Sequence, residues 1–308
     1  MERDPCLLFL GEDIGARGGP FGASRGLLDR FGPGRILDTP ISENGFVAAA
    51  IGSSLAGVPA IAEVSYIDFI TLAMDPIVNV AAKAHYMSGG KQTAPVVIRT
   101  EGGAGSAADG PTHAQSLEAW FVHVPGLKVV MPSTPYDHKG LLKSAIRDPN
   151  PVIFIENKML YRAKGPVPEG EYLLPIGVAD VKREGKDLTV VATGAMVAKA
   201  LAAAESLAGE GVELEVIDPR TLAPLDLETI ASSVKKTGRL IVMQEAAIAA
   251  SFGSEVSRAV GDAAFDYLEA PIKVIGSTVP YPASPALEAA VLPTDRTLVQ
   301  AVHDLLGR

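Results

Sequence analysis

Glu43 is the acidic residue whose surroundings most strongly suggest chemistry. Pro40 keeps the residue before it extended, and Ser42 or Asn44 can cap a helix that starts here. Residues 46–55 are almost wholly apolar, which predicts a helix buried on most sides. A carboxylate at such a helix start either interacts with the helix dipole and water or is a buried acid with a catalytic role.

A second group of candidates combines two aromatic rings with a histidine. Tyr66 and Phe69 follow the apolar run 60–64, and ligands of open α/β sheets bind outside the carboxyl ends of strands. Their rings either stack on a flat ligand or pack in the core. His113 follows the glycine-rich stretch 103–110, where an imidazole either titrates near neutral pH or serves a structural role. The other histidines lack metal-ligand spacing, so we predict no zinc site.

Two short motifs imitate known sites without their structural context. Gly22-Ala-Ser-Arg-Gly26 matches a hydrolase nucleophile motif, but the residues before it read as a loop and not as the required strand. The stretch 103–108 imitates a dinucleotide fingerprint, yet Gly110 and Pro111 follow where a helix should begin. We therefore interpret Ser24 as a helix cap and the glycine-rich stretch as a loop over a site.

The elements that must position these residues alternate between strand and helix, which indicates parallel sheets in an α/β fold. In the first part we predict strands at 7–10, 60–64, 95–99, 127–131 and 152–155, and helices at 24–31, 45–56, 70–87, 115–122 and 136–147. In the second part we predict strands at 188–193, 212–217, 239–243 and 272–275, and helices at 195–209, 226–235, 251–264 and 297–306. A proline- and glycine-rich linker at 164–175 separates two α/β domains, 1–163 and 176–308, and 276–295 reads as a packed loop.

Composition narrows the class of protein. Apolar residues make up 47% and charged residues 20% of the 308 residues, as in a folded globular protein. A net charge of −9 argues against nucleic acid as a partner. The chain holds one cysteine, Cys6, and no apolar run of membrane-spanning length, so we expect a cytoplasmic protein without membrane contact.

Several ordered motifs carry a resemblance that covers nearly the whole chain. They are Gly11-Glu-Asp-Ile-Gly15, Asp38-Thr-Pro-Ile-Ser-Glu43, Tyr86-Met-Ser-Gly-Gly90, His113-Ala-Gln-Ser116, Pro125-Gly-Leu-Lys-Val-Val130, Pro132-Ser-Thr-Pro-Tyr-Asp137 and Asp218-Pro-Arg-Thr-Leu222. The chain resembles the beta subunit of the thiamine-diphosphate-dependent decarboxylase of 2-oxo acid dehydrogenase complexes. The resemblance implies a transketolase-like pyrimidine-binding domain followed by a smaller transketolase C-terminal domain.

The resemblance also implies which groups the chain lacks. The family's alpha subunit binds the diphosphate and its magnesium through a Gly-Asp-Gly motif, and the nearest stretch here is Gly261-Asp262-Ala263 within a predicted helix. We therefore expect thiamine diphosphate to be shared with an alpha subunit. The implied partners are two alpha chains, a second beta chain and the lipoyl acyltransferase core. The small residues of the helices 45–57 and 77–90 fit such interfaces.

The roles of the candidate residues follow from the resemblance. Glu43 would hydrogen-bond to the pyrimidine nitrogen, which favours the tautomer that removes the thiazolium proton. Phe69 would stack on the pyrimidine, with Tyr66 beside it, and His113 would face the substrate carboxylate or the lipoyl group. The family's His-Ser-Gln element reads His113-Ala-Gln115 here, so any role of the serine hydroxyl is absent.

A potassium site is a further implication of the resemblance. The turn that contains Ala145, Asp148 and Asn150 resembles a potassium site in relatives, with Val96 as a further carbonyl ligand. Oxygen ligands in a loop suit a hard cation. A plain helix C-terminus followed by a turn explains the same residues.

Function is expected on the same basis. We expect oxidative decarboxylation of pyruvate with reductive acylation of the lipoyl group. The alternatives are an acetoin dehydrogenase beta subunit and a branched-chain 2-oxo acid dehydrogenase beta subunit. A transketolase-like assembly module without catalysis is the non-enzymatic alternative. The presence of Glu43, Phe69 and His113 argues against it.

Overall fold

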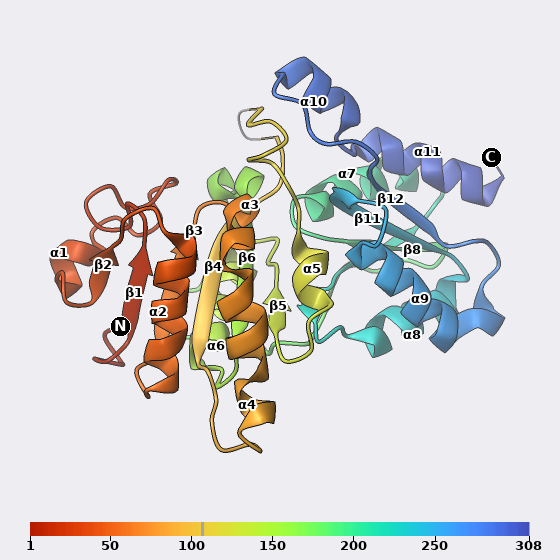
Figure 1. Cartoon of the computed structure of the whole chain (residues 1–308). Helices are drawn as coiled ribbons and strands as arrows, with labels where there is room; N and C mark the ends of the chain where they lie inside the picture. The colour runs from red at the N-terminus through yellow and green to blue at the C-terminus, as the bar shows by residue number, and fades with distance from the viewer. Residues whose placement is uncertain (106–107, 308) are drawn as a thin grey trace.

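The computed structural model describes residues 1–105 and 108–307, and two sheets lie side by side in it (Figure 1). Within the described residues the first sheet has seven strands in the order β10-β5-β6-β4-β3-β1-β2. Its members are β1 (Leu8–Gly11), β2 (Ile36–Asp38), β3 (Ala60–Val64), β4 (Val96–Gly102), β5 (Lys128–Val130), β6 (Val152–Asn157) and β10 (Thr221–Ala223). All pairs are parallel except β10 with β5. The centre of this sheet is therefore parallel, as the sequence predicts.

The second sheet has five strands in the described chain, in the order β12-β11-β8-β9-β7. They are β7 (Asp180–Arg183), β8 (Leu188–Ala192), β9 (Leu214–Asp218), β11 (Leu240–Ala247) and β12 (Lys273–Ser277). Here only β7 runs antiparallel to its neighbour. The sequence did not predict β2, β7 or β10, which are short and lie at sheet edges.

Helices cover both faces of each sheet. In the first half they are α1 (Leu27–Phe31), α2 (Glu43–Leu55), α3 (Ile67–Ile70), α4 (Ala84–Met87), α5 (Glu118–Val122) and α6 (Pro135–Arg147). In the second half they are α7 (Met196–Ala208), α8 (Leu227–Thr237), α9 (Phe252–Ala264), α10 (Pro285–Val291) and α11 (Asp295–Leu306). In Figure 1, α2 and the run from α3 to α4 lie on the near face of the first sheet and α6 on its far face.

Three predicted elements differ from the structure. The predicted helix 70–87 is a series of short helical segments, with a π-helix at Pro76–Val80, because Pro76 has no N–H to donate within a regular α-helix. The predicted loop 276–295 contains α10. Helix α2 is buried on one face only: Ala48, Ala49 and Gly52 are exposed, so the expectation of burial on most sides is wrong for the single chain.

The apolar core does not stop between the two sheets. One cluster of buried side chains includes Ile153 of β6, Leu222 of β10, Val191 of β8 and Val242 of β11. Strand β10 belongs to the second half of the sequence but pairs with β5 of the first sheet. The two halves are therefore packed into one body, and loops from both can reach the carboxyl edge of the first sheet.

Candidate active site

Glu43 is the first residue of α2, and its side chain is buried. Ser42 occupies the N-cap position but makes no side-chain capping bond, and Asn44 lies inside the helix. The carboxyl group of Glu12, in the loop after β1, lies close to Glu43. Burial raises the pKa of Glu12, and the neighbouring charges of Glu43 and Asp13 raise it further. Its Oε1 has no hydrogen-bond partner. The loop after β1 and the start of α2 thus bring two carboxyl groups near each other.

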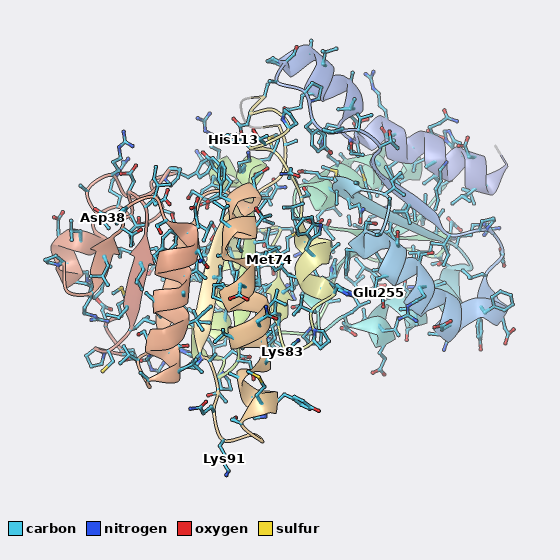
Figure 2. All side chains as sticks on the ribbon, in the orientation of Figure 1. Asp38, Met74, Lys83, Lys91, His113 and Glu255 are labelled. Atoms are coloured by element: carbon cyan, nitrogen blue, oxygen red, sulfur yellow. The ribbon has the colours of Figure 1, made fainter. Side chains whose placement is uncertain are left out.

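The predicted aromatic residues and the histidine lie together. The His113 ring makes edge contacts with Phe69, at 5.1 Å between centroids, and with Tyr66, at 6.0 Å. Figure 2 shows His113 above the end of the first sheet where α3 begins. Phe21, which the sequence did not indicate, contacts the edge of Tyr66 at 6.1 Å. The carboxyl edge of β3 thus presents aromatic rings beside an imidazole.

A polar cavity of about 650 Å³ opens at this edge of the sheet. Glu12, Phe21, Tyr66 and Tyr161 are among the residues that line it. Phe21 stacks on Tyr161 at 4.3 Å between ring centroids. The cavity combines flat aromatic rings with carboxylate and arginine side chains, which suits a planar ligand with polar groups.

Lys158 is a buried cation that the sequence reasoning missed. It is the first residue of the 3₁₀ helix Lys158–Arg162 after β6. Its ammonium pairs with Asp109 at 2.6 Å, donates to the carbonyl oxygen of His113, and lies 4.8 Å from the centre of the Tyr66 ring. No sequence pattern could have indicated it, because its partners lie in loops 45 to 92 residues away in the chain.

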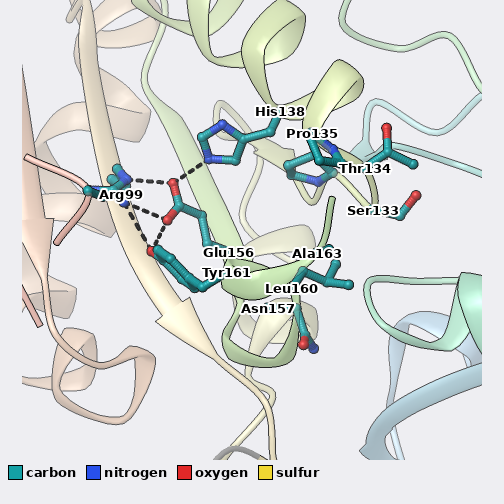
Figure 3. A pocket seen from close by; sticks show the side chains of 12 residues that line it. Arg99, Ser133, Thr134, Pro135, His138, Glu156, Asn157, Leu160, Tyr161 and Ala163 are labelled. Atoms are coloured by element: carbon teal, nitrogen blue, oxygen red, sulfur yellow. Dashed lines mark hydrogen bonds and ion pairs between the residues drawn. The ribbon is translucent and has the colours of Figure 1, made fainter. Parts of the chain in front are cut away.

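A cluster of charged side chains surrounds the hydroxyl of Tyr161, one of the residues that line the cavity (Figure 3). The Arg99 guanidinium donates to Glu156 and Glu63, and to the Tyr161 hydroxyl at 3.0 Å. His138 lies 2.7 Å from Glu156 and borders a second cavity of about 280 Å³. Burial favours protonation of Glu156, but the charge of Arg99 and the bond from His138 outweigh it and lower the pKa of Glu156 to about 2.

Among the residues that it describes, the structure gives no catalytic role to the Gly-x-Ser-x-Gly match at 22–26 and no dinucleotide-binding helix after the glycine-rich stretch 103–105. Ser24 is buried, and its hydroxyl donates to the carbonyl oxygen of Ile14 at 2.7 Å, so it neither caps α1 nor acts as a nucleophile. Gly26 occupies the N-cap position of α1. In the glycine-rich loop, Ser106 and Ala107 lie outside the described residues. The residues on either side, up to Gly105 and from Ala108, form no helix.

Comparison with known proteins decides the family. A model described as "Transketolase, pyrimidine binding domain" matches residues 1–164, and one described as "Transketolase, C-terminal domain" matches residues 177–298. The acetoin:2,6-dichlorophenolindophenol oxidoreductase subunit beta of Cupriavidus necator is 47% identical over 98% of the chain and 92% of that relative. The pyruvate dehydrogenase E1 component subunit beta of Rickettsia felis is 44% identical over 98% and 93%.

The chain belongs to this family of beta subunits. A solved structure described as "Split gene transketolase, inactive beta4 tetramer" superposes with a TM-score of 0.79 and 25% identity, and the match covers 99% of this chain and 93% of the other. The expected fold, two transketolase-like α/β domains in this order, is confirmed.

The stretch nearest to a Gly-Asp-Gly motif, Gly261-Asp262-Ala263, lies within α9. Asp262 lies on α9, exposed, and pairs with Arg258 at 2.7 Å. Across residues 1–105 and 108–307, no group of three or more His, Cys, Asp or Glu side chains is placed to hold a metal ion. In the same residues, no helix has both the length and the apolar character needed to cross a bilayer.

The residues of the expected potassium site lie at one end of α6 and at the start of β4. Asp148 is the C-cap of α6, and its N–H donates to the carbonyl oxygen of Ala145 at 3.2 Å. Its carboxylate accepts from Asn150 and pairs with the ammonium of Lys128. Val96 begins β4. These contacts describe a capped helix end that already carries a cation, and the potassium site stays a prediction.

Proposed function

We propose that this chain is the beta subunit of a thiamine-diphosphate-dependent 2-oxo acid dehydrogenase that decarboxylates pyruvate oxidatively and acylates a lipoyl group. The observation that carries the proposal is the arrangement at the carboxyl edge of β3. A buried acid at the start of α2 lies beside Glu12, which lines the same cavity as Tyr66. His113 contacts Tyr66 and Phe69 at that edge. Relatives named as pyruvate dehydrogenase subunits support the choice of substrate.

The residues present fit the aminopyrimidine end of the cofactor. Glu12 has a buried oxygen without a partner beside Glu43, and the rings of Tyr66 and Phe69 offer flat surfaces. Thiamine diphosphate, when bound, would supply a nucleophilic carbon for the oxo group and a sink for the electron pair released with carbon dioxide. Glu43, at the start of α2, would hydrogen-bond to a ring nitrogen of the pyrimidine and exchange a proton with it. His113 orients the substrate carboxylate or the lipoyl group.

A partner chain completes the site. Binding of the diphosphate and magnesium needs groups supplied by an alpha subunit, in an assembly of two alpha and two beta chains. The small exposed residues of α2 and the exposed side chains of Leu72, Tyr86 and Met87 provide apolar surface for such contacts. Docking to the acyltransferase core and a cytoplasmic location complete the proposal, the latter because the chain has a single cysteine.

Acetoin cleavage is the second candidate, and a specific observation favours it. The relatives from Cupriavidus necator and Bacillus subtilis, 47% and 45% identical, are both named as acetoin:2,6-dichlorophenolindophenol oxidoreductase subunits. The two reactions differ in the group bonded to the oxo carbon: in pyruvate it is a carboxylate, released as carbon dioxide, and in acetoin it is a carbinol carbon, released as acetaldehyde. Assays of the two-chain enzyme with pyruvate and with acetoin, each with dichlorophenolindophenol as acceptor, separate the two candidates.

Calorimetric titration with thiamine diphosphate and magnesium tests the shared site. We expect no binding by the beta chain alone at micromolar cofactor, and binding once the alpha chain is added. Light scattering should give a beta dimer alone and a tetramer with the alpha chain. Tight cofactor binding by the beta chain alone contradicts the proposal, as does a stable monomer.

A further inference from the structure

The loop that carries His113 is anchored at both ends by buried carboxylates. At its start, the N–H of Ala104 donates to Glu245 of β11 at 3.1 Å. At its end, Asp68 of α3 accepts from the Gln115 side chain at 2.8 Å and from its backbone N–H at 3.3 Å. These bonds fix the loop ends, one on β11 of the second sheet and the other on α3. They do not by themselves fix His113 between them.

Lys158 supplies the missing contact in the middle of the loop. Its side chain is fully buried, so its ammonium must be paired and hydrogen-bonded to offset the loss of water. It meets that need with the Asp109 carboxylate and the His113 carbonyl, both in the loop. Its third neighbour is the face of the Tyr66 ring, which attracts a cation. One ammonium therefore joins the histidine loop to the aromatic rings.

Burial gives this arrangement a defined geometry. An ammonium without access to water cannot exchange its partners for solvent. Lys158 therefore holds the His113 backbone in a fixed position relative to the Tyr66 ring. The His113 imidazole is otherwise held by weaker contacts: ring edges at 5.1 and 6.0 Å, and the Thr112 hydroxyl at 3.0 Å from Nδ1.

We propose that Lys158 is a positioning residue that sets the place of His113 over Tyr66 and Phe69. The inference rests on the proposed function, in which His113 acts on the substrate. Lys158 acts through the loop, because its ammonium is bonded to Asp109 and to the His113 carbonyl and its side chain is fully buried. Its loss should therefore displace the imidazole without removing any group that touches cofactor or substrate.

A double-mutant cycle in the enzyme reconstituted with its alpha chain tests the proposal. Lys158→Met should lower kcat with pyruvate about ten- to hundredfold, because small displacements of a reacting group cost this much. Lys158→Arg, which keeps the charge, should recover most of the rate. On a His113→Ala background, Lys158→Met should cost less than about threefold more, since it acts through the missing imidazole. If the losses of kcat from Lys158→Met and His113→Ala multiply in the double mutant, the proposal is wrong.

Amide hydrogen exchange of the same complexes gives a readout that does not depend on turnover. Lys158→Met should speed exchange across residues 108–115 about tenfold or more, because the loop loses its central anchor. The matched control is Lys182→Met, which removes another largely buried ammonium, one that pairs with Asp137 and Asp180 outside the loop. It should leave exchange at 108–115 unchanged. Unchanged exchange in Lys158→Met overturns the proposal. An inactive wild-type complex overturns the proposed function alone, and the exchange result then decides on Lys158.

Discussion

The charged cluster around Arg99 and the one around Asp137 are both buried, yet they balance charge differently. One guanidinium lies among three carboxyl groups, those of Glu63, Glu101 and Glu156. Burial, followed by the charge of Glu63, raises the pKa of Glu101 to about 8. This cluster has fewer positive groups than carboxyl groups, so one carboxyl holds its proton at neutral pH.

The second cluster joins α6 to the second sheet. Lys182 pairs with Asp137 and Asp180 at 2.6 and 2.7 Å, and Arg220 pairs with the same two carboxylates at 2.6 and 2.8 Å. Burial favours protonation of Asp137, but the bonds from Lys182 and Thr134 outweigh it and lower its pKa. Two cations therefore keep this carboxylate charged.

The difference separates a region suited to chemistry from a region that holds the fold together. The Arg99 cluster borders the cavities at the carboxyl edge of the first sheet and keeps a proton that can be lost near neutral pH. The Asp137 cluster spans the two halves of the sequence, between α6 and β7. Substitutions near the cavity should change rate and pH dependence, and substitutions at the junction should change stability.

The largest expected effect is on catalysis at the carboxyl edge. Glu43→Gln should fold normally but lower pyruvate decarboxylation by about a hundredfold to ten-thousandfold, because an amide cannot exchange a proton with the pyrimidine nitrogen. Turnover of the reconstituted enzyme measures the effect, and circular dichroism checks the fold. A variant that keeps near wild-type turnover would remove Glu43 from the mechanism and with it the contrast between the two regions.

The next effect is on stability at the junction. Asp137→Asn should lower the free energy of unfolding by about 3 kcal/mol, because it leaves Lys182 and Arg220 with one carboxylate fewer in a buried site. The rate per folded molecule should stay within twofold of the wild type. Denaturant unfolding and turnover at low temperature measure the two quantities. A large loss of rate with unchanged stability would reverse the assigned roles.

Much of the fold could be predicted because its signals are local. The strands β3, β4, β6 and β8 lie at largely apolar stretches of the sequence, and the structure buries them on both faces. Strand β10 could not be predicted, because its three residues join a sheet formed by the first half of the chain. The exposed face of α2 was wrongly expected to be buried, since alanine and glycine fit a core as well as an interface.

The candidate site also contains residues that the sequence predicts and one that it does not. Glu43, Tyr66, Phe69 and His113 stand next to recognisable strand ends and helix starts, and the structure brings the last three into contact. Lys158 could not be predicted, because a lysine after a strand is usually exposed and its partners are remote in sequence. The charge balance of a cluster depends on distances between strands, which a single sequence does not contain.

The pH dependence of stability should distinguish the two clusters by sign. The pKa of Glu101 is raised in the folded protein, so its stabilising contribution is present below about pH 4.5 and is lost as the pH rises through about 8. In that interval it lowers the free energy of unfolding by at most about 1.4 kcal/mol per pH unit. Glu101→Gln should remove this slope.

The cluster around Asp137 shows the opposite pH dependence. The pKa of Asp137 is lowered in the folded protein, so its contribution is present above its ordinary pKa of 3.8 and is lost as the pH falls below it. Unfolding midpoints from pH 3 to pH 9 for the wild type, Glu101→Gln and Asp137→Asn measure both slopes. If Glu101→Gln keeps the wild-type slope between pH 5 and 8, the proton that the Arg99 cluster holds at neutral pH does not reside on Glu101.

The smallest expected effect compares two buried alanines, one beside His113 and one on α9. Ala114, next to His113, packs with Ala104 and Tyr281, where a serine hydroxyl would meet apolar side chains. Ala114→Ser should lower the free energy of unfolding by about 1 kcal/mol, because a buried hydroxyl needs a hydrogen-bond partner. Ala264→Ser on α9 is the matched control and should cost less, since a serine in a helix can bond to the carbonyl of the preceding turn. Thermal unfolding of both variants measures the difference. A stabilised Ala114→Ser protein would mean that the loop offers the hydroxyl a partner, and that the alanine at this position removes a polar contact from the site.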